Sequence, residues 1–210
     1  MALDLEEQEQ LAELKSWWKQ HGGFIVMVVL ALALAFAGWQ GWRWVQASRT
    51  AEAGALFDAL AKGAQAGDAK AVRDASGSLI ESYPGTLYAP MGALTAARFH
   101  FERGDLKSAG AQLQWVIEQS PSEDLRDLAR LRLAEVLLDE KAYDEALKLL
   151  DAPHAAAYDA HYAALRGDVL VAKNQPAEAR AAYQLALEKS AQRDGPFRDS
   201  VRMRLEALGG

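Results

Sequence analysis

The sequence predicts an all-α protein: one N-terminal transmembrane helix, then an α-solenoid of about three to four helical hairpins with a C-terminal capping helix. Three observations predict this fold. An uncharged apolar run lies near the N-terminus, a turn-plus-helix signature recurs through the rest of the chain, and an amphipathic segment ends it. A chain of 210 residues, 50% hydrophobic and 25% charged, fits one modest globular domain plus a more apolar element.

The apolar run covers residues 22–39, and we predict a transmembrane helix over residues 22–44. A helix rises about 1.5 Å per residue and the hydrocarbon core of a bilayer is about 30 Å thick, so about 20 residues span it. Indole rings collect at headgroup depth, and five tryptophans lie at the two ends of the run: Trp17, Trp18, Trp39, Trp42 and Trp44. The pattern favours a membrane anchor over the buried core helix of a soluble protein.

The segment before the run, residues 1–21, is predicted to be a short cytoplasmic leader. It is acidic where a cleaved signal peptide carries basic residues, so the anchor is expected to be uncleaved. Lys15 and Lys19 on one side of the run are nearly matched by Arg43 and Arg49 on the other, and the positive-inside rule therefore does not decide the orientation. Cysteine is absent, which excludes disulfides and catalytic thiols and is compatible with either compartment.

Small residues recur within the predicted span. Ala31 and Ala35, then Ala37 and Gly41, have the spacing that lets two helices pack closely in lipid, and we predict that they form a packing face. The alternative is that alanine and glycine are simply common in membrane helices.

Residues 45–210 are predicted to form the repeat domain. Apolar residues first recur at spacings of three and four, which predicts an amphipathic helix continuing out of the bilayer: Ala53, Leu56, Phe57, Leu60, Ala61 and Ala64. A turn-plus-helix signature then begins at four positions, separated by 37, 37 and 33 residues: Gly67, Gly104, Lys141 and Asn174. Each separation is close to the length of one helical hairpin.

Small and apolar residues keep register with this signature. Five residues into each unit lie Val72, Ala109, Ala146 and Ala179, and twelve residues before the last three lie Ala97, Ala134 and Gly167. Small residues at facing positions let antiparallel helices approach closely, which is the tetratricopeptide pattern in degenerate form. An ordinary helical bundle with a coincidental period is the alternative. After the turn at Asp194, Gly195 and Pro196, a terminal amphipathic helix is expected to cover the end of the stack, with Phe197, Val201, Leu205 and Leu208 on its apolar face.

The chain resembles the YfgM family of ancillary SecYEG translocon subunits over nearly its whole length. The resemblance is carried by LKSWWKQHG, GWQGWRW, SAGAQLQWVI, LRLAEV, DEALKLLD and LRGDVLVAKNQPAEARAAYQLAL. It implies a single-pass protein of the bacterial inner membrane with a cytoplasmic N-terminus and a periplasmic repeat domain. It also implies association with the SecYEG translocon and with a membrane-anchored periplasmic chaperone of the PpiD type, and a link to the Rcs stress response.

The residues give little support for catalysis. Of the four histidines only His154 and His161 are close in sequence, and two histidines without a carboxylate or thiolate at ligand spacing make a poor metal site. Motifs for nucleotide binding or hydrolysis are absent from the sequence, and no cofactor is predicted. Because the net charge is −6, nucleic acid is not an expected partner.

Protein binding is the class of function that remains after these exclusions. In a tetratricopeptide stack the first helix of each hairpin lines a concave groove, which is where a partner or an unfolded or emerging chain would lie. For any single leucine the alternative is core packing between hairpins. The predicted groove residues are Met91, Leu94, Arg98, Phe101, Leu128, Leu131, Glu135, Leu138, Ala164, Asp168 and Val171.

The sequence therefore predicts a non-enzymatic scaffold whose helix holds a repeat domain beside the secretion channel. Two alternatives stay open. One is a regulatory adaptor that controls a signalling protein through residues 1–21, and the other is an enzyme acting on envelope polymers, for which the sequence shows no catalytic constellation.

Overall fold

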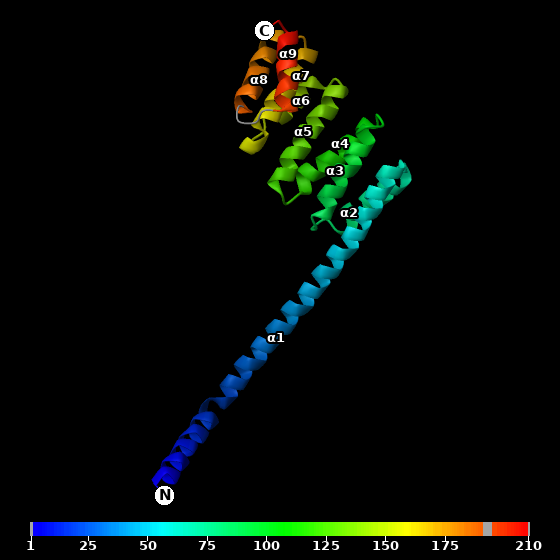
Figure 1. The fold of residues 1–210 in the computed structure, drawn as a ribbon. Helices are drawn as coiled ribbons and strands as arrows, with labels where there is room; N and C mark the ends of the chain where they lie inside the picture. The colour runs from blue at the N-terminus through cyan, green and yellow to red at the C-terminus, as the bar shows by residue number, and fades with distance from the viewer. Residues whose placement is uncertain (1, 191–194, 210) are drawn as a thin grey trace. The chain divides into compact units, whose positions relative to one another are not determined.

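The computed structural model describes residues 2–190 and 195–209, and these form helices joined by turns, without a strand among them (Figure 1). They divide into two compact units, Met1–Arg49 and Thr50–Gly210. The predicted all-α class is confirmed. The elements are α1 (Ala2–Ala66), α2 (Ala69–Ser82), α3 (Tyr88–Phe101), α4 (Leu106–Gln119), α5 (Glu123–Asp139), α6 (Tyr143–Leu150), the 3-10 turn η1 (Ala156–Tyr158), α7 (Asp159–Ala172), α8 (Pro176–Lys189) and α9 (Pro196–Ala207).

Helix α1 includes the leader, the apolar run and the first helix of the repeat domain, which the apolar spacing had predicted to continue out of the bilayer. It is long and apolar enough to cross a membrane, and its apolar run is almost entirely exposed. An exposed run of this length is not the buried core helix of a soluble domain. The first unit thus contains a helix with the length and exposed apolar surface that a membrane anchor requires.

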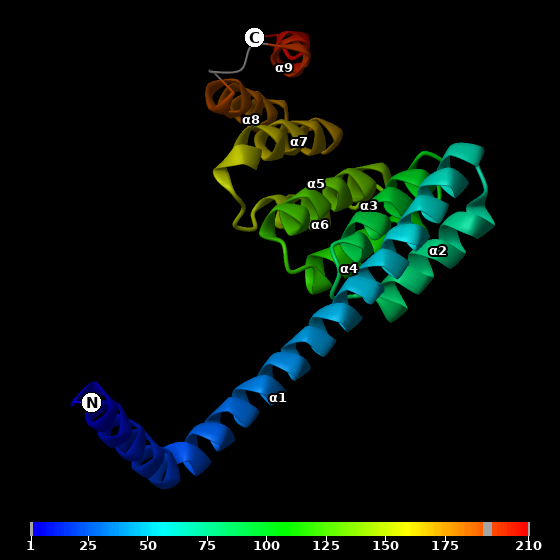
Figure 2. The ribbon, with the colours of Figure 1, turned by 60° about the horizontal axis from the view of Figure 1, so that its bottom comes forward.

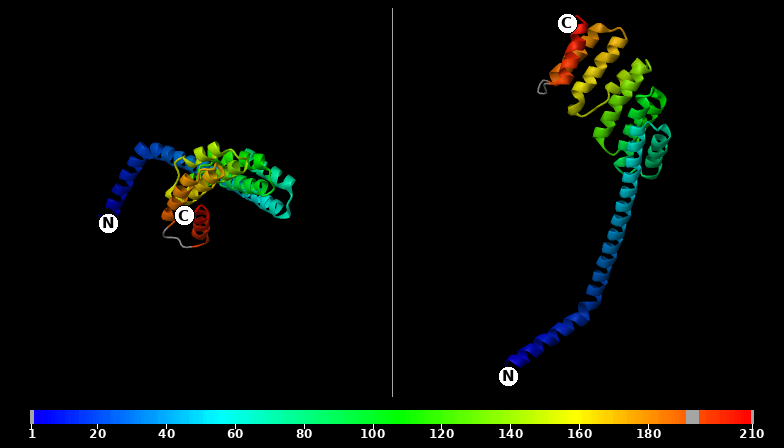
Figure 3. Two further views of the ribbon diagram at one scale, coloured as in Figure 1. Left: turned by 90° about the horizontal axis from the view of Figure 1, so that it is seen from above. Right: turned by 45° about the vertical axis from the view of Figure 1, so that its right-hand side comes forward.

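In the second unit the helices succeed one another as antiparallel pairs (Figures 1 and 3). The C-terminal part of α1 pairs with α2, because Leu60 shares a buried cluster with Val72 and Gly63 lies against Ala71. The later pairs are α3 with α4, α5 with α6 and α7 with α8. The first pair packs on the next one, because Ala53 and Leu60 of α1 share a buried cluster with Ala96 and Phe99 of α3. The domain is therefore a stack of four hairpins.

The recurring signature marks the left-handed residue between the two helices of each hairpin. Gly67, Gly104, Lys141 and Asn174 have φ angles of 76°, 75°, 62° and 61°. In all four turns the next residue's N–H donates to a carbonyl five residues earlier, at 2.8–2.9 Å. This is the Schellman arrangement, which satisfies carbonyls at a helix end and requires a positive φ. The sequence period thus reports a repeated backbone geometry.

Lys141 is the one unsuitable residue among these four, because a lysine Cβ is strained in the left-handed region. Lys141→Gly is expected to raise the free energy of unfolding by about 1 kcal/mol, since glycine adopts this conformation without strain. Urea unfolding of the full-length protein in mild detergent, followed by circular dichroism, measures the change. Lys62→Gly is the matched control: Lys62 is exposed inside α1, where the same substitution should cost about 1 kcal/mol. If the two variants shift stability in the same direction, the argument about Lys141 is wrong.

The predicted packing positions lie in the core. Val72, Ala109, Ala146 and Ala179 are all fully buried. Gly167 of α7 lies against the ring of Tyr183 of α8, so closely that an added Cβ would be 2.3 Å from the ring carbon Cε1. Small residues at these positions set how closely the paired helices approach.

Helix α9 covers the end of the stack, as predicted. Val201 is fully buried in the cluster that α7 and α8 form, and Phe197, Leu205 and Leu208 pack against it. Arg180 of α8 also donates from Nε to the carbonyl of Leu208 at 3.0 Å. Of the predicted preceding turn, Asp194 lies outside the described residues.

Candidate partner-binding groove

A pocket of about 230 Å³ opens between α3, α4 and α5. Its apolar lining comes from Ala97 and Phe101 of α3, Leu113 of α4 and Val136 of α5. Three of these four side chains are buried and Phe101 is partly exposed. The pocket thus lies between the first helices of two successive hairpins, over a floor that belongs to the core. Four charged residues complete the lining: Arg98, Glu102, Arg132 and Glu135.

These four charged residues differ in how far they are already engaged. Arg98 donates from Nε to Oε1 of Glu102 at 2.7 Å, one helical turn away, and both side chains are mostly exposed. Among the described residues, Arg132 and Glu135 have neither a hydrogen bond nor an ion pair of their own. A guanidinium carries five donors in a planar fork that matches a carboxylate, so Arg132 is free to bind one.

Glu135 lies in a partly desolvated position beside the pocket. Burial is the main cause that raises the pKa of its carboxyl, and the charge of Arg132 opposes this shift. The carboxylates of Asp168 and Asp139 add to the rise. A carboxylate that is partly desolvated and near like charges gains from a cationic or hydrogen-bond-donating partner.

Asp168 of α7 continues the same polar face but already has partners. Its Oδ1 accepts a hydrogen bond from the Tyr183 hydroxyl at 2.8 Å, and its Oδ2 accepts one from Nη1 of Arg204 at 2.7 Å. Burial raises the pKa of Asp168, and the hydrogen bonds from Tyr183 and Arg204 act against the rise. Asp168 therefore ties α9 to α7, and Arg204 brings a positive charge to this end of the face.

The geometry suits recognition of an extended protein segment. An apolar hollow beside a free guanidinium and a partly buried carboxylate can take one apolar side chain and neighbouring polar groups of a bound chain. The side chains around the pocket show neither a nucleophile beside a base nor a cluster of metal ligands. Among the described residues, no group of three His, Cys, Asp or Glu side chains is placed to hold a metal ion.

Comparison with known proteins identifies the family. A family model described as a tetratricopeptide repeat-like domain matches residues 15–210. An ancillary SecYEG translocon subunit of Neisseria gonorrhoeae is 33% identical, covering 99% of this chain and 100% of that protein. The chain belongs to this family of ancillary subunits. Proteins of the same description from Haemophilus influenzae and Escherichia coli are 30% and 26% identical, over 91% and 87% of this chain and 94% and 87% of their own lengths.

A solved structure, titled MamA RS-1 ArsTM double mutant, has the same fold. It superposes with a TM-score of 0.53 at 20% identity and covers 75% of this chain and 94% of its own. At this identity the likeness concerns the arrangement of the helices alone.

The family's repeat fold exposes some of the predicted groove residues and buries others. Arg98, Phe101 and Glu135 line the pocket. Met91 and Val171 are 43% and 42% exposed. The other exposed or partly exposed members of the predicted set are Leu94, Leu128, Leu138 and Asp168.

Two residues of the predicted groove are part of the core instead. Leu131 is 8% exposed and packs with residues of α6 and α7, and Ala164 is 3% exposed in the cluster beneath α9. The neighbouring Arg132 faces the pocket in place of Leu131. Neighbouring residues on a helix point about 100° apart, so residues 131 and 132 lie on different faces. The prediction chose Leu131, which is in the core, where Arg132 is the residue at the pocket.

Five residues that line the pocket were not among the predicted groove residues: Ala97, Glu102, Leu113, Arg132 and Val136. The signal for Arg132 was present in the sequence: it lies three residues before Glu135 and four after Leu128, the spacing of one helical face. The prediction chose Leu131 because apolar residues were expected to line the groove. A pairing such as that of Arg204 with Asp168, 36 residues apart, has no comparable local signal.

A second hollow, of about 480 Å³, lies at the start of α5 beside the loop before α7. Asp127 is 4% exposed there. Its carboxylate accepts from Nη1 of Arg130 at 2.5 Å and from the Ala155 N–H at 2.9 Å, and its carbonyl accepts from the Tyr162 hydroxyl at 2.8 Å. Burial and the nearby Asp127 raise the pKa of Tyr162 to about 12. These bonds satisfy the buried charge, so the cluster joins α5 to α7.

The two histidines considered as ligands have separate partners. The His154 ring stacks on Tyr162 with centroids 3.8 Å apart, while the His161 ring lies 4.4 Å from that of Phe197 on α9. His154 lies in the loop before α7, as its sequence context indicated. Both rings thus contribute to packing.

The small residues of the anchor are exposed along α1. At about 100° per residue, the Ala31 and Ala35 pair lies about 120° around the helix from the Ala37 and Gly41 pair. One neighbouring helix can therefore contact one pair at a time. Their packing role stays a prediction.

Proposed function

We propose that this protein is a membrane-anchored, non-enzymatic scaffold at the bacterial secretion channel. Its helix associates with the SecYEG translocon and crosses the inner membrane, with residues 1–21 in the cytoplasm. The repeat domain lies in the periplasm and binds a membrane-anchored periplasmic chaperone, or translocating chains, along the face that includes the pocket between α3 and α5.

The observation that carries the proposal is similarity over the whole chain. The relative from Neisseria gonorrhoeae is covered from end to end, anchor and repeats together, and it is described as a subunit of the translocon. A match confined to the repeats would support protein binding in general. Coverage of the anchor as well supports the same site of action in the membrane.

The pocket supports the choice of binding surface. Arg132 and Glu135 offer unpaired charges beside an apolar hollow, whereas the neighbouring Arg98 and Asp168 are already engaged. Anchoring also confines the domain to the membrane surface, which raises the effective concentration of a membrane-bound partner, so modest groove affinity suffices.

Affinity purification of the full-length protein from bacterial membranes in mild detergent tests both parts of the proposal. The wild-type protein should recover SecYEG and a periplasmic chaperone. The double variant Arg98→Glu with Arg132→Glu should recover SecYEG equally but at least about tenfold less chaperone, because it makes all four charged residues at the pocket negative. Leu131→Glu is avoided because it would place a charge in the core.

A second double variant, with the same change in net charge at a different surface, is the control. Arg73→Glu with Lys107→Glu alters exposed residues on α2 and α4, the second helices of their hairpins, and should leave both recoveries unchanged. Equal loss of the chaperone in both double variants would show that the pocket is not the chaperone-binding surface. Absence of SecYEG from the wild-type eluate would contradict the translocon role itself.

A further inference from the structure

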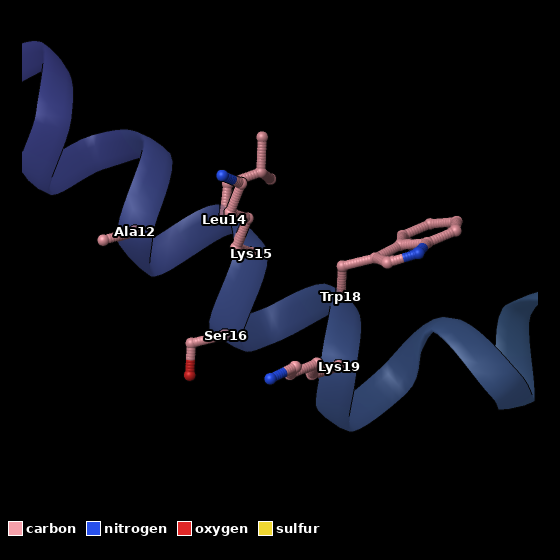
Figure 4. A pocket seen from close by; sticks show the side chains of 6 residues that line it. All are labelled: Ala12, Leu14, Lys15, Ser16, Trp18 and Lys19. Carbon is pink, nitrogen blue, oxygen red and sulfur yellow. The ribbon is translucent and has the colours of Figure 1, made fainter.

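The leader part of α1 carries an apolar face that the proposed function does not use. Leu11, Leu14, Trp17 and Trp18 are 57%, 61%, 49% and 53% exposed. At about 100° per residue they fall within an arc of about 120° on one side of the helix. Figure 4 shows Leu14 and Trp18 on one side of α1 and Ser16 on the other. A hollow lies beside this face, and all six residues that line it belong to α1 itself.

Charged and polar residues occupy most of the helix surface outside this arc. Lys15 and Glu13 lie beside the two edges of the apolar arc, and the long stem of Lys15 lets its ammonium group reach headgroup phosphates. Ser16, Lys19 and Gln20 lie on the side of the helix away from the arc. Two tryptophans on the arc are the residues most typical of the interface between membrane and water.

The junction with the apolar run permits a change of direction. Gly22 and Gly23 are adjacent, and paired small residues are a common cause of helix bends. A Cβ on Gly22 would lie 3.0 Å from Cε2 of Trp18, so this glycine leaves room for the indole to lie along the helix. Figures 2 and 3 show α1 changing direction within its blue N-terminal part.

A straight continuation would leave part of the apolar face in water. Leu11 lies twelve residues before Gly23, and at about 1.5 Å per residue a straight helix would carry it about 18 Å beyond the start of the span. On such a rod Leu11 and Leu14 would stay hydrated, beyond the headgroup depth of the two tryptophans. Lying along the headgroup layer buries them beside the bilayer that the same helix crosses.

We propose that residues 11–21 form an interfacial helix, which turns at Gly22 and Gly23 and lies in the headgroup layer of the membrane that the anchor spans. Its occupant is the lipid surface itself, on which the apolar arc lies. The segment fixes the depth and rotation of the anchor, because a helix held at the surface limits how the adjoining span can slide or turn.

The cysteine-free chain allows a direct test. Single cysteines replace Leu14 or Trp18 on the apolar arc, and Ala12 or Ser16 outside it, in the full-length protein. Each is spin-labelled and reconstituted at high lipid dilution into vesicles of three parts phosphatidylcholine to one part phosphatidylglycerol. Collision rates with oxygen, which enters lipid, and with a water-soluble nickel chelate are then measured. The label itself reports position, so the result does not depend on repeat-domain stability.

The expected result is a higher oxygen-to-nickel ratio at positions 14 and 18 than at positions 12 and 16. Equal exposure to nickel at all four positions would overturn the proposal. So would protection that rises with protein density or that needs added translocon, since a second copy or a partner protein would then cover the face.

Discussion

Replacing Asp127 with alanine is expected to lower the free energy of unfolding of the repeat domain by about 3–5 kcal/mol. The buried carboxylate holds Arg130 and the Ala155 N–H, so its loss leaves a largely buried guanidinium without its counter-charge and a loop N–H without its acceptor. Loss of a partner from a buried ion pair costs far more than the pair contributes over an apolar replacement, because the remaining charge stays desolvated. Urea unfolding of the full-length protein in mild detergent, followed by circular dichroism, measures the effect.

Two further variants show whether burial is the cause. Asp127→Asn keeps the shape and one acceptor oxygen, and it should lose less stability than alanine. Asp74→Ala removes the same type of side chain from an exposed pair with Lys70 and should leave stability unchanged within error. A loss for Asp127→Ala no larger than that for Asp74→Ala would show that the cluster between α5 and α7 does not stabilise the stack.

Gly167→Ala is expected to destabilise the domain by about 1–3 kcal/mol, although alanine is the better helix former. The added methyl would lie 2.3 Å from Cε1 and 2.5 Å from Cδ1 of Tyr183. That ring is 2% exposed, and its hydroxyl is held by Asp168, so it has little freedom to move away. The helices α7 and α8 would have to separate. The same unfolding measurement applies.

Gly77→Ala is the matched control for this substitution. Gly77 lies inside α2, with open space where its Cβ would be, so alanine there should raise the free energy of unfolding by about 0.5–1 kcal/mol. Opposite signs at the two sites would confirm that close approach, rather than helix propensity, determines the result. In a Tyr183→Leu background Gly167→Ala should cost less than in the wild type, and an undiminished cost would contradict the proposed clash.

The consequence extends to the candidate groove. The ring of Tyr183 packs against Gly167, and its hydroxyl donates a hydrogen bond to Asp168. Asp168 also accepts a hydrogen bond from Arg204 of α9. Separation of α7 from α8 would therefore disturb the polar face next to Glu135, whose pKa responds to the charge of Asp168. A partner that contacts this face should bind Gly167→Ala less well even under conditions where the variant is folded.

Much of this architecture depends on interactions between residues close in the chain, so it could be predicted from the sequence. The apolar run has the length of a bilayer crossing, and that property needs no tertiary context. The four signature residues mark left-handed turns because each turn is formed by hydrogen bonds within six or seven consecutive residues. The small residues at Ala97, Ala134 and Gly167 follow from the close approach of helices that are neighbours in the chain.

The candidate groove required the tertiary structure. Periodicity showed that α5 has an apolar side, but the exchange of Leu131 for Arg132 depends on where α6 and α7 lie against that helix. Likewise, Asp168 of α7 was predicted as a groove residue, yet it already accepts a hydrogen bond from Arg204 of α9, 36 residues further along the chain. The sequence by itself determined the anchor, the hairpins and their turns, because short-range backbone and helix-periodic forces define them. Only the packed stack decided which charges stay free to bind, since that depends on contacts between residues far apart in the chain.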